Sequence, residues 1–230
     1  MMRTLAFDAD DTLWHNETYY AETQEAFRAL LRPFHDDAWI DARLHDTEMR
    51  NLGHYGYGIK GFTLSMIETA LELTEDRLDG AGIRQVVELG KAMLAKPVEP
   101  LPGVAEVLQQ LARSFDLMVI TKGDLFDQET KLAKSGLGGH FSKIEIVSEK
   151  DEAAYVAILD RHDIAPDAFT MVGNSVKSDI LPVLALGARA VHIPYHLTWA
   201  HEVVAEPVES PFPVLDSIRD LPAWLAAHSS

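Results

Sequence analysis

The sequence predicts an α/β protein, in which an all-helical domain is inserted into a doubly wound, mostly parallel sheet. Three observations support this fold class. A short apolar segment, Thr4–Phe7, predicts a buried strand. Residues 15–97 contain no convincing strand, and their apolar residues recur at helical spacing. Beyond Pro102, strand and helix patterns alternate, which is typical of a parallel sheet with helices on both faces.

The inserted segment has the pattern of amphipathic helices at residues 17–31, 38–52, 62–73 and about 83–95. The first ends before Pro33, because proline cannot continue a helix. A Gly-rich stretch, residues 53–61, separates the second from the third. Prolines between residues 97 and 102 mark a linker. We therefore predict a helical domain at residues 15–97, and a core domain formed by residues 1–14 and 98–230.

The core domain continues with a regular alternation of elements. Glycines 136 and 187 are placed to end two of its helices. We predict strands at residues 117–120, 144–147, 169–172 and 190–193, and helices at residues 104–114, 125–135, 152–162, 179–186 and near 222–227.

The composition narrows the functional classes. The formal net charge is −16, whereas a broad nucleic-acid interface needs clustered Lys and Arg, so we expect no nucleic-acid partner. No apolar run approaches the roughly 20 residues that span a bilayer, and the N-terminus leads directly into a strand, so we expect no membrane association, no signal peptide and a cytoplasmic location. The chain has no cysteine, which excludes disulfides, thiol chemistry and Cys-ligated zinc.

Two acidic residues, Asp8 and Asp10, directly follow the first predicted strand, and Thr12 comes two residues later. Burying either carboxylate costs several kcal/mol unless a cation or hydrogen-bond donors compensate for its charge. A divalent metal ion would provide that compensation. The segment therefore predicts an acidic metal site.

Polar residues also follow the later strands. The strand at 117–120 is followed by Thr121 and Lys122, the strand at 144–147 by Lys150, and the strand at 169–172 by the loop Gly173–Asp179. Because ligands of parallel sheets bind beyond the carboxyl ends of the strands, these groups should converge at one edge. They would supply a nucleophile, a metal site and donors for an anion.

With these motifs in this order, the chain resembles the haloacid dehalogenase-like (HAD) superfamily of phosphohydrolases. That family has Asp-x-Asp-x-Thr after the first strand, then a Thr or Ser, a Lys and an acidic loop after later strands. The matching residues span nearly the whole chain and are Asp8, Asp10, Thr12, Thr121, Lys150 and the loop at residues 173–179. The resemblance implies a Rossmann-like HAD core, and the helical insert resembles the helical (C1-type) cap of the family.

The resemblance also implies a two-step phosphoryl transfer. Asp8 would attack phosphorus and form an aspartyl-phosphate, and Asp10 would serve as general acid and then general base. Mg²⁺ would be held by the Asp8 carboxylate, the Asp10 backbone carbonyl and the acidic loop through Asn174 and Asp179. The phosphoryl oxygens would be held by Thr12, Thr121, Lys122 and Lys150.

Two residues depart from the family pattern. Asn174 stands where the family has the first acid of its last motif, and its uncharged amide oxygen would weaken Mg²⁺ binding and leave Asp179 to carry more of the site. Lys122 stands where the family often has Asn or another small polar residue. It would add positive charge near the phosphate or point to solvent.

The Gly-rich stretch of the helical domain is the expected location of substrate contacts. Its G-x-G-x-x-G pattern at residues 56–61 follows a helix rather than a strand, which is the wrong context for dinucleotide binding. A loop of the cap over the active site fits better. On that hypothesis, Tyr55, Tyr57 and Lys60 would contact the substrate.

The leading functional hypothesis is a Mg²⁺-dependent phosphatase that hydrolyses a small phosphorylated metabolite. A sugar-phosphate mutase of the same superfamily would also keep Asp10 and stays open as an alternative. A dehalogenase would replace the second acid, so Asp10 argues against it. A signalling receiver module also has an acidic pocket, but its phosphorylated Asp follows a later strand, where this chain has Thr121 or Ser148. Nucleotide monophosphates, sugar phosphates and phosphoglycolate all fit the expected substrate class. The sequence leaves the oligomeric state open.

Overall fold

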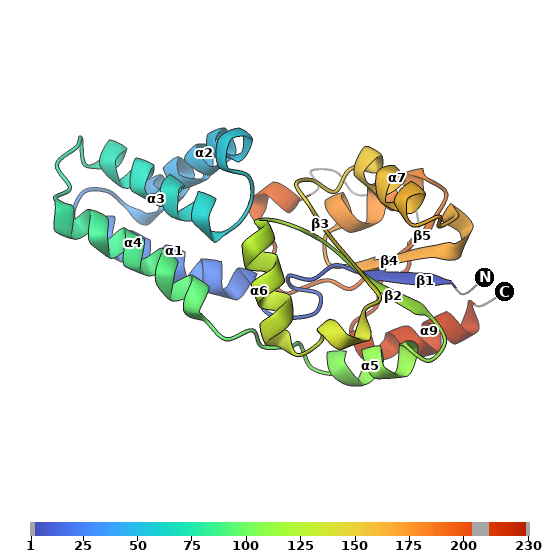
Figure 1. Cartoon of the computed structure of the whole chain (residues 1–230). Helices are drawn as coiled ribbons and strands as arrows, with labels where there is room; N and C mark the ends of the chain where they lie inside the picture. The colour runs from blue at the N-terminus through green and yellow to red at the C-terminus, as the bar shows by residue number, and fades with distance from the viewer. Residues whose placement is uncertain (1–2, 204–211, 229–230) are drawn as a thin grey trace. The chain divides into compact units, whose positions relative to one another are not determined.

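A computed structural model describes residues 3–203 and 212–228 (Figure 1). The chain divides into two compact units. We call them the α/β unit, formed by residues Met1–Glu17, Val98–Lys122 and Gln128–Ser230, and the helical unit, formed by Thr18–Pro97 and Gly123–Asp127. Each unit has a hydrophobic core of its own.

The described residues of the α/β unit form a five-stranded parallel sheet in the order β3-β2-β1-β4-β5. The strands are β1 Thr4–Phe7, β2 Asp116–Lys122, β3 Lys143–Val147, β4 Phe169–Gly173 and β5 Arg189–His192. The N-terminal strand is thus the central one, and Phe7 is paired with Val119 on one side and Val172 on the other. The predicted doubly wound α/β fold class is confirmed.

Both faces of the sheet are buried, which explains why β1 reads as a continuous apolar run. Leu5 and Phe7 pack into a core with helices α5 (Val104–Leu111) and α9 (Leu221–Ala227). Ala6 points to the other face, into a core with helix α7 (Glu152–Arg161). Figure 1 shows α5 and α9 together on one side of the sheet and α7 on the other.

The predicted helix at residues 179–186 is instead a π-helical turn, Val176–Ile180, followed by helix α8, Leu181–Ala185. The Ser175 hydroxyl accepts a hydrogen bond from the backbone N–H of Ser178 at 3.1 Å, which caps the wide turn. Pro182 lies at the start of α8, where its missing N–H costs nothing. As a result, Asp179 lies inside the turn and is buried.

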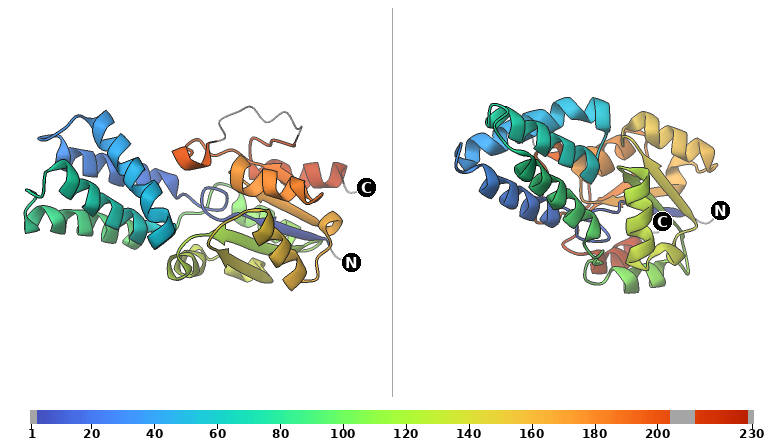
Figure 2. Two further views of the ribbon diagram at one scale, coloured as in Figure 1. Left: turned by 90° about the horizontal axis from the view of Figure 1, so that it is seen from above. Right: turned by 60° about the vertical axis from the view of Figure 1, so that its left-hand side comes forward.

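The helical unit packs four amphipathic segments around one core. Phe27, Ile40, Met66 and Val86, one from each helix, are fully buried in it, and Figure 2 shows these helices packed side by side. Asp36 and Asp79 cap the second and fourth helices by accepting backbone N–H groups. The helices are α1 Glu17–Leu31, α2 Asp37–Tyr55, α3 Ile59–Leu73 and α4 Gly80–Ala95.

The connection between α2 and α3 is shorter than the predicted Gly-rich loop, because only residues 56–58 lie between the helices. Gly56 ends α2 with a φ of 67° and Gly58 precedes α3 with a φ of 113°, and glycine adopts such positive values without steric cost. Two glycines therefore turn the chain within three residues.

Helix α6, Leu125–Ser135, begins in a segment that is grouped with the helical unit. In that segment Asp124 accepts a hydrogen bond from the Lys60 ammonium group at 2.8 Å. The same ammonium group lies 5.3 Å from the centre of the Phe126 ring. These contacts explain why residues 123–127 belong with the helices, although they follow β2 in sequence.

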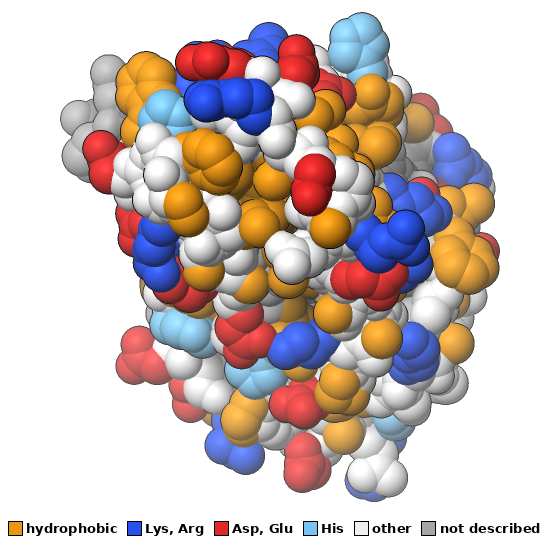
Figure 3. All heavy atoms as spheres, turned by 90° about the vertical axis from the view of Figure 1, so that its left-hand side faces the viewer, with side chains coloured by type: hydrophobic (Ala, Val, Ile, Leu, Met, Phe, Trp, Pro, Cys, Tyr) orange, Lys and Arg blue, Asp and Glu red, His pale blue; other side chains and the backbone are white. Residues whose placement is uncertain are grey.

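The surface charge is mixed on the face that Figure 3 shows, where acidic and basic side chains are interspersed with hydrophobic ones. Exposed ion pairs of the helical unit, such as Arg32 with Glu25 and Asp37, follow this pattern. Among the described residues, no helix is long and apolar enough to cross a membrane.

Candidate active site

The loop after β1 turns sharply at the carboxyl edge of the sheet. The backbone N–H of Asp8 still donates to the carbonyl of Val172 at 2.9 Å, so Asp8 is fixed at the end of the central strand. Asp11 adopts a φ of 64°, and its carboxylate accepts the backbone N–H groups of Asn16 and Glu17. The third acid of the motif therefore has a structural role in the turn, while Asp8 and Asp10 project from it.

Asp8, Lys150 and Asp179 form a buried ion triad. The Lys150 ammonium group lies 2.5 Å from Asp8 Oδ1 and 2.8 Å from Asp179 Oδ1. The side chains of Lys150 and Asp179 are 2% and 1% exposed. The structure thus brings together three predicted site residues that are contributed by β1, the segment after β3 and the loop after β4.

The triad carries two carboxylates but only one cation. Burial raises the pKa of Asp8 to about 7, because the nearby Lys150 offsets only part of the desolvation cost and Asp179 adds repulsion. The two carboxylates raise the pKa of Lys150 above its usual range against the opposing effect of burial, so Lys150 stays charged. The site therefore lacks positive charge.

The pKa values of three further side chains near the triad are also raised. Burial raises the pKa of Asp11 to about 8 and that of Glu17 to about 7, and the negative charge of Asp10 adds to both shifts. Burial likewise raises the pKa of Tyr155, whose hydroxyl donates to the carbonyl of Ser178 at 3.0 Å. Burial is the main cause of these shifts, and neighbouring carboxylates add to each of them, so an additional cation nearby would favour the ionised forms.

Two acceptor oxygens converge next to the triad. Thr12 Oγ1 lies 3.0 Å from Asp8 Oδ2 and 3.2 Å from Asn174 Oδ1. A hydroxyl has a single hydrogen and can donate to only one of them at a time. Both are hard oxygen ligands of the kind that Mg²⁺ prefers. The donor set and the missing charge therefore fit a divalent cation.

Such a cation would not be held by carboxylates alone. Within residues 3–203 and 212–228, no group of three or more His, Cys, Asp or Glu side chains is arranged to hold a metal ion. Asp179 uses one oxygen for Lys150 and accepts the backbone N–H of Ser175 at 3.0 Å with the other. The Asn174 amide and backbone oxygens would have to complete the site.

The position of Asp179 depends on Gly173. A Cβ atom added to Gly173 would overlap the carboxylate of Asp179, which packs directly against the glycine. We expect Gly173→Ala to displace this carboxylate and to lower kcat by roughly 10- to 100-fold, because small misplacements at a catalytic site have effects of this size. Gly139→Ala, where the added Cβ meets nothing within 4 Å, is the control. Steady-state kinetics of both variants test this, and equal rates would contradict it.

The Asp10 carboxylate is surrounded by donors. Its Oδ1 accepts the indole N–H of Trp14 at 2.7 Å, and its Oδ2 accepts the Gln128 amide at 2.8 Å. Lys131 Nζ lies 3.1 Å from both oxygens. Gln128 and Lys131 are not among the site residues predicted from the sequence. Gln128 and Lys131 lie three residues apart on the helix that follows Thr121, and thus on one face of that helix. This spacing is the signal that could have identified them.

Lys122 and Thr121 lie at the end of β2, and Thr121 is buried. Lys122 forms an ion pair with Glu202, whose carboxylate also accepts the hydroxyls of Ser175 and Ser178. Burial alone would raise the pKa of Glu202, but Lys122 and the two serines lower it to about 2. Glu202 was also missed, because nothing in its local sequence marks it. The Glu202 carboxylate connects Lys122 to the loop that follows β4.

Glu202→Gln is expected to lower the free energy of unfolding at pH 7 by about 3 kcal/mol, at about 1.4 kcal/mol per pKa unit. A carboxylate whose pKa is lowered by folding stabilises the protein only while ionised. The difference is therefore present above about pH 4.5 and shrinks as the pH falls toward 2. Urea unfolding at pH 7 and pH 3 measures it, and the loss at pH 3 should be less than half as large.

Glu149→Gln is the matched control, because Glu149 Oε1 lies 3.6 Å from Lys122 Nζ and its side chain is half-exposed. Such a pair is worth at most about 1 kcal/mol. A Glu202→Gln effect that is equally small, or one that is independent of pH, would contradict the assigned role of Glu202.

The three predicted substrate contacts belong to the helical unit. Tyr55 ends α2 with its side chain exposed, and its hydroxyl donates to Glu68 at 3.4 Å. Tyr57 lies in the short connection, and Lys60 lies in the first turn of α3, where it pairs with Asp124. Their contact with substrate stays a prediction.

Comparison with known proteins is consistent with the geometry. The chain is 24% identical to the pyrimidine 5′-nucleotidase YjjG of Escherichia coli (strain K12), over 96% of this chain and 97% of that protein. It superimposes on the crystal structure of a haloacid dehalogenase-like family hydrolase from Xanthomonas campestris with a TM-score of 0.87 and 41% identity, covering 98% of this chain and 91% of the other.

The L-2-haloacid dehalogenase of Xanthobacter autotrophicus shares the fold, with a TM-score of 0.68, 16% identity and complete coverage of both chains. The family model of haloacid dehalogenase-like hydrolases matches residues 2–187, a range that contains Asp8, Thr121, Lys150 and Asp179. Together with the relative from Xanthomonas campestris, this match shows that the chain belongs to the haloacid dehalogenase-like hydrolase family.

Proposed function

We propose that the protein is a Mg²⁺-dependent phosphatase of small phosphomonoesters, with Asp8 as nucleophile and Asp10 as general acid and base. The observation that carries the proposal is Asp10 itself. An acid at this position serves to protonate the oxygen that leaves from phosphorus. A dehalogenase expels a halide, which needs no proton, and would have another residue here. Here Asp10 is present, and three side chains donate to its carboxylate, which supports a working role for it.

In the first step, an oxygen of Asp8 attacks phosphorus, and the bond between phosphorus and the ester oxygen breaks. Asp10 gives its proton to the departing oxygen, so the alcohol leaves neutral and Asp8 carries the phosphoryl group. In the second step, Asp10 takes a proton from water, and the resulting hydroxide attacks phosphorus. Inorganic phosphate leaves and Asp8 is regenerated.

Lys150 keeps the Asp8 carboxylate oriented through its 2.5 Å contact and offsets negative charge as the phosphate approaches. Thr12 and Thr121 offer hydroxyls at the same edge of the sheet. Asp8, Asn174 and the Asp10 carbonyl would hold Mg²⁺, and Asp179 would support them through Lys150. When bound, the metal would supply the positive charge that the triad lacks.

The substrate we propose is a small phosphorylated metabolite rather than a nucleic acid or a membrane component. The net charge of −16 disfavours polyanionic partners. Nucleoside 5′-monophosphates are the first class to test, because the similar Escherichia coli protein is a pyrimidine 5′-nucleotidase. The family match, which is to a hydrolase, argues against the receiver-module alternative.

The experiment is phosphate release from p-nitrophenyl phosphate and a metabolite panel, with Mg²⁺ and with EDTA. We expect Mg²⁺-dependent hydrolysis that the Asp8→Asn variant lacks. Chloride release from L-2-chloropropionate without phosphatase activity would favour a dehalogenase. Isomerisation of hexose 1-phosphates without net phosphate release would favour a mutase. Either result, or no hydrolysis of any phosphate, would overturn the proposal.

A further inference from the structure

Helix α6 brings a lysine and a glutamine to the carboxylate of Asp10. Gln128 and Lys131 are one helical turn apart, and both reach Asp10 from the same face of α6. Gln128 is 4% exposed, and the side chain of Lys131 is 13% exposed. The contacts are partly buried, since the Asp10 side chain is 22% exposed, so water and salt screen them less than a fully exposed ion pair.

The geometry fixes the plane of the carboxylate. Lys131 Nζ is 3.1 Å from each carboxylate oxygen and thus bridges them. Trp14 donates to Oδ1 and Gln128 to Oδ2, so each oxygen has a second donor of its own. A carboxylate that is held at both oxygens from two separate elements has little freedom to rotate about its side-chain torsions.

Lys131 also joins the carboxylate to a side chain beyond the turn, because its ammonium group donates to the amide oxygen Oδ1 of Asn16 at 2.8 Å. The turn around Asp11 positions Asn16 itself. The lysine therefore links α6 to both ends of the loop that carries Asp10. The amide of Gln128 is oriented by the same carboxylate, since its nitrogen must face the oxygen that accepts from it.

We propose that Lys131 and Gln128 are positioning residues that hold the Asp10 carboxylate in place for proton transfer to the leaving oxygen and from the attacking water. The inference rests on the proposed phosphatase function and deepens it. Neither residue needs to touch substrate. Their effect is exerted through Asp10, so it should depend on how much the leaving group needs an acid.

The test compares Lys131→Met with wild type on phosphate esters of different leaving groups. General acid catalysis is worth about 10²- to 10⁴-fold, so kcat/KM for a nucleoside 5′-monophosphate or phenyl phosphate should fall by about 100-fold or more. For p-nitrophenyl phosphate, whose nitrophenolate leaves without a proton, kcat/KM should change less than about 10-fold. Its kcat should fall nevertheless, because Asp10 must still activate water. A burst of nitrophenolate equal to the enzyme concentration should appear.

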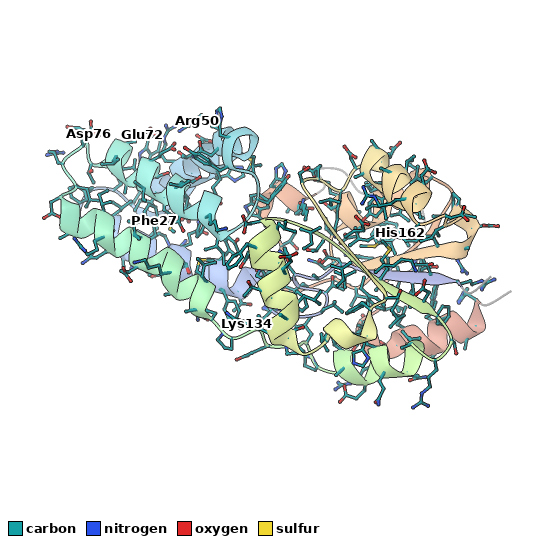
Figure 4. The ribbon with its side chains drawn as sticks, viewed as in Figure 1. Phe27, Arg50, Glu72, Asp76, Lys134 and His162 are labelled. Atoms are coloured by element: carbon teal, nitrogen blue, oxygen red, sulfur yellow. The ribbon has the colours of Figure 1, made fainter. Side chains whose placement is uncertain are left out.

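Lys134→Met, three residues further along α6, is the control (Figure 4). Lys134 is exposed, so the same charge is removed from the same helix and all rates should stay within about threefold. Lys131→Arg retains the charge and two donors and should restore kcat/KM for phenyl phosphate to within about 10-fold of wild type. If Lys131→Met does not fold, Gln128→Leu replaces it. Its kcat/KM should show the same dependence on the leaving group, with a smaller fall for each ester.

An equal fall of kcat/KM for every leaving group would overturn the inference, because a structural or phosphate-binding role affects all esters alike. Failure of the arginine variant to recover activity would also count against it. Absence of phosphatase activity in the wild-type enzyme would instead remove the proposed function. The two failures are therefore distinguishable.

Discussion

Asp8→Asn is expected to lower phosphatase kcat on the order of 10⁴- to 10⁶-fold, the size of loss that follows removal of a catalytic nucleophile. The amide cannot form the phosphoryl-enzyme, while its shape preserves the contacts of Asp8 with Thr12 and the strand end. Rapid quenching in acid followed by intact-mass measurement should show one phosphoryl group on the wild type and none on the variant.

Asp11→Asn is the matched control, since it makes the same chemical change three residues further along the same loop. Asp11 accepts backbone N–H groups within the turn, which an amide oxygen can still do. We expect the control to retain at least about a tenth of wild-type kcat. Phosphatase activity of Asp8→Asn at the control level, or an intact phosphoryl-enzyme in it, would exclude Asp8 as nucleophile.

The Asp8→Asn variant should also change how the free energy of unfolding depends on pH. Folding raises the pKa of Asp8 from 3.8 to about 7 in the metal-free protein, so the folded state binds a proton that the unfolded state releases. This contribution is fully present below pH 3.8 and is lost as the pH rises to about 7. The Asp8→Asn variant has no such group to titrate and does not lose this contribution. Its free energy of unfolding, measured in EDTA, should therefore rise relative to that of the wild type between pH 4 and pH 7.

The second large effect is expected from Lys150→Met. Removing the cation leaves Asp8 and Asp179 buried without compensation, and breaking such a pair costs about 3–5 kcal/mol. Urea unfolding at pH 8 in EDTA should show this loss in the free energy of unfolding. Phosphatase kcat should fall by at least about 10³-fold, because in the proposed mechanism the lysine would also offset charge at the reacting phosphate.

Lys91→Met is the control for the substitution. Lys91 pairs with Glu88 on the surface of α4, where both side chains are largely exposed, and such a pair contributes at most about 1 kcal/mol. The double variant Lys150→Met, Asp179→Asn should unfold less easily than Lys150→Met alone, since one uncompensated charge is gone. A single variant as stable as wild type would show that the triad is not a buried ion cluster.

Much of the fold could be predicted because local patterns determine it. The predicted bounds of β1, α1 and α6 agree with the structure, since apolar runs, helical spacing and Gly136 mark them. Helix α3 begins earlier than predicted, at Ile59, because Gly58 turns the chain abruptly. The π-helical turn at Val176–Ile180 was not predicted, since it depends on side-chain hydrogen bonds of Ser175 that periodicity does not reveal.

In the candidate site, too, some residues are marked by local sequence patterns, whereas others are brought in only by tertiary packing. Strand ends identified Asp8, Lys150 and Asp179, because parallel strands deliver their following residues to one edge. Lys131 contacts Asp10 across 121 positions of sequence, and Glu202 contacts Lys122 across 80. No spacing rule links residues so far apart. Only the packing of α6 and of the segment after β5 brings these partners together.

The central place of β1 in the sheet has a consequence for synthesis on the ribosome. Residues 4–7 leave the exit tunnel before the helical unit, yet their first sheet partner, β2, ends at residue 122. At 5–20 residues per second, this strand waits on the order of ten seconds for a neighbour. The helical unit has its own core and can fold in that interval. The central strand of the sheet is therefore the one that stays exposed longest without a partner during translation.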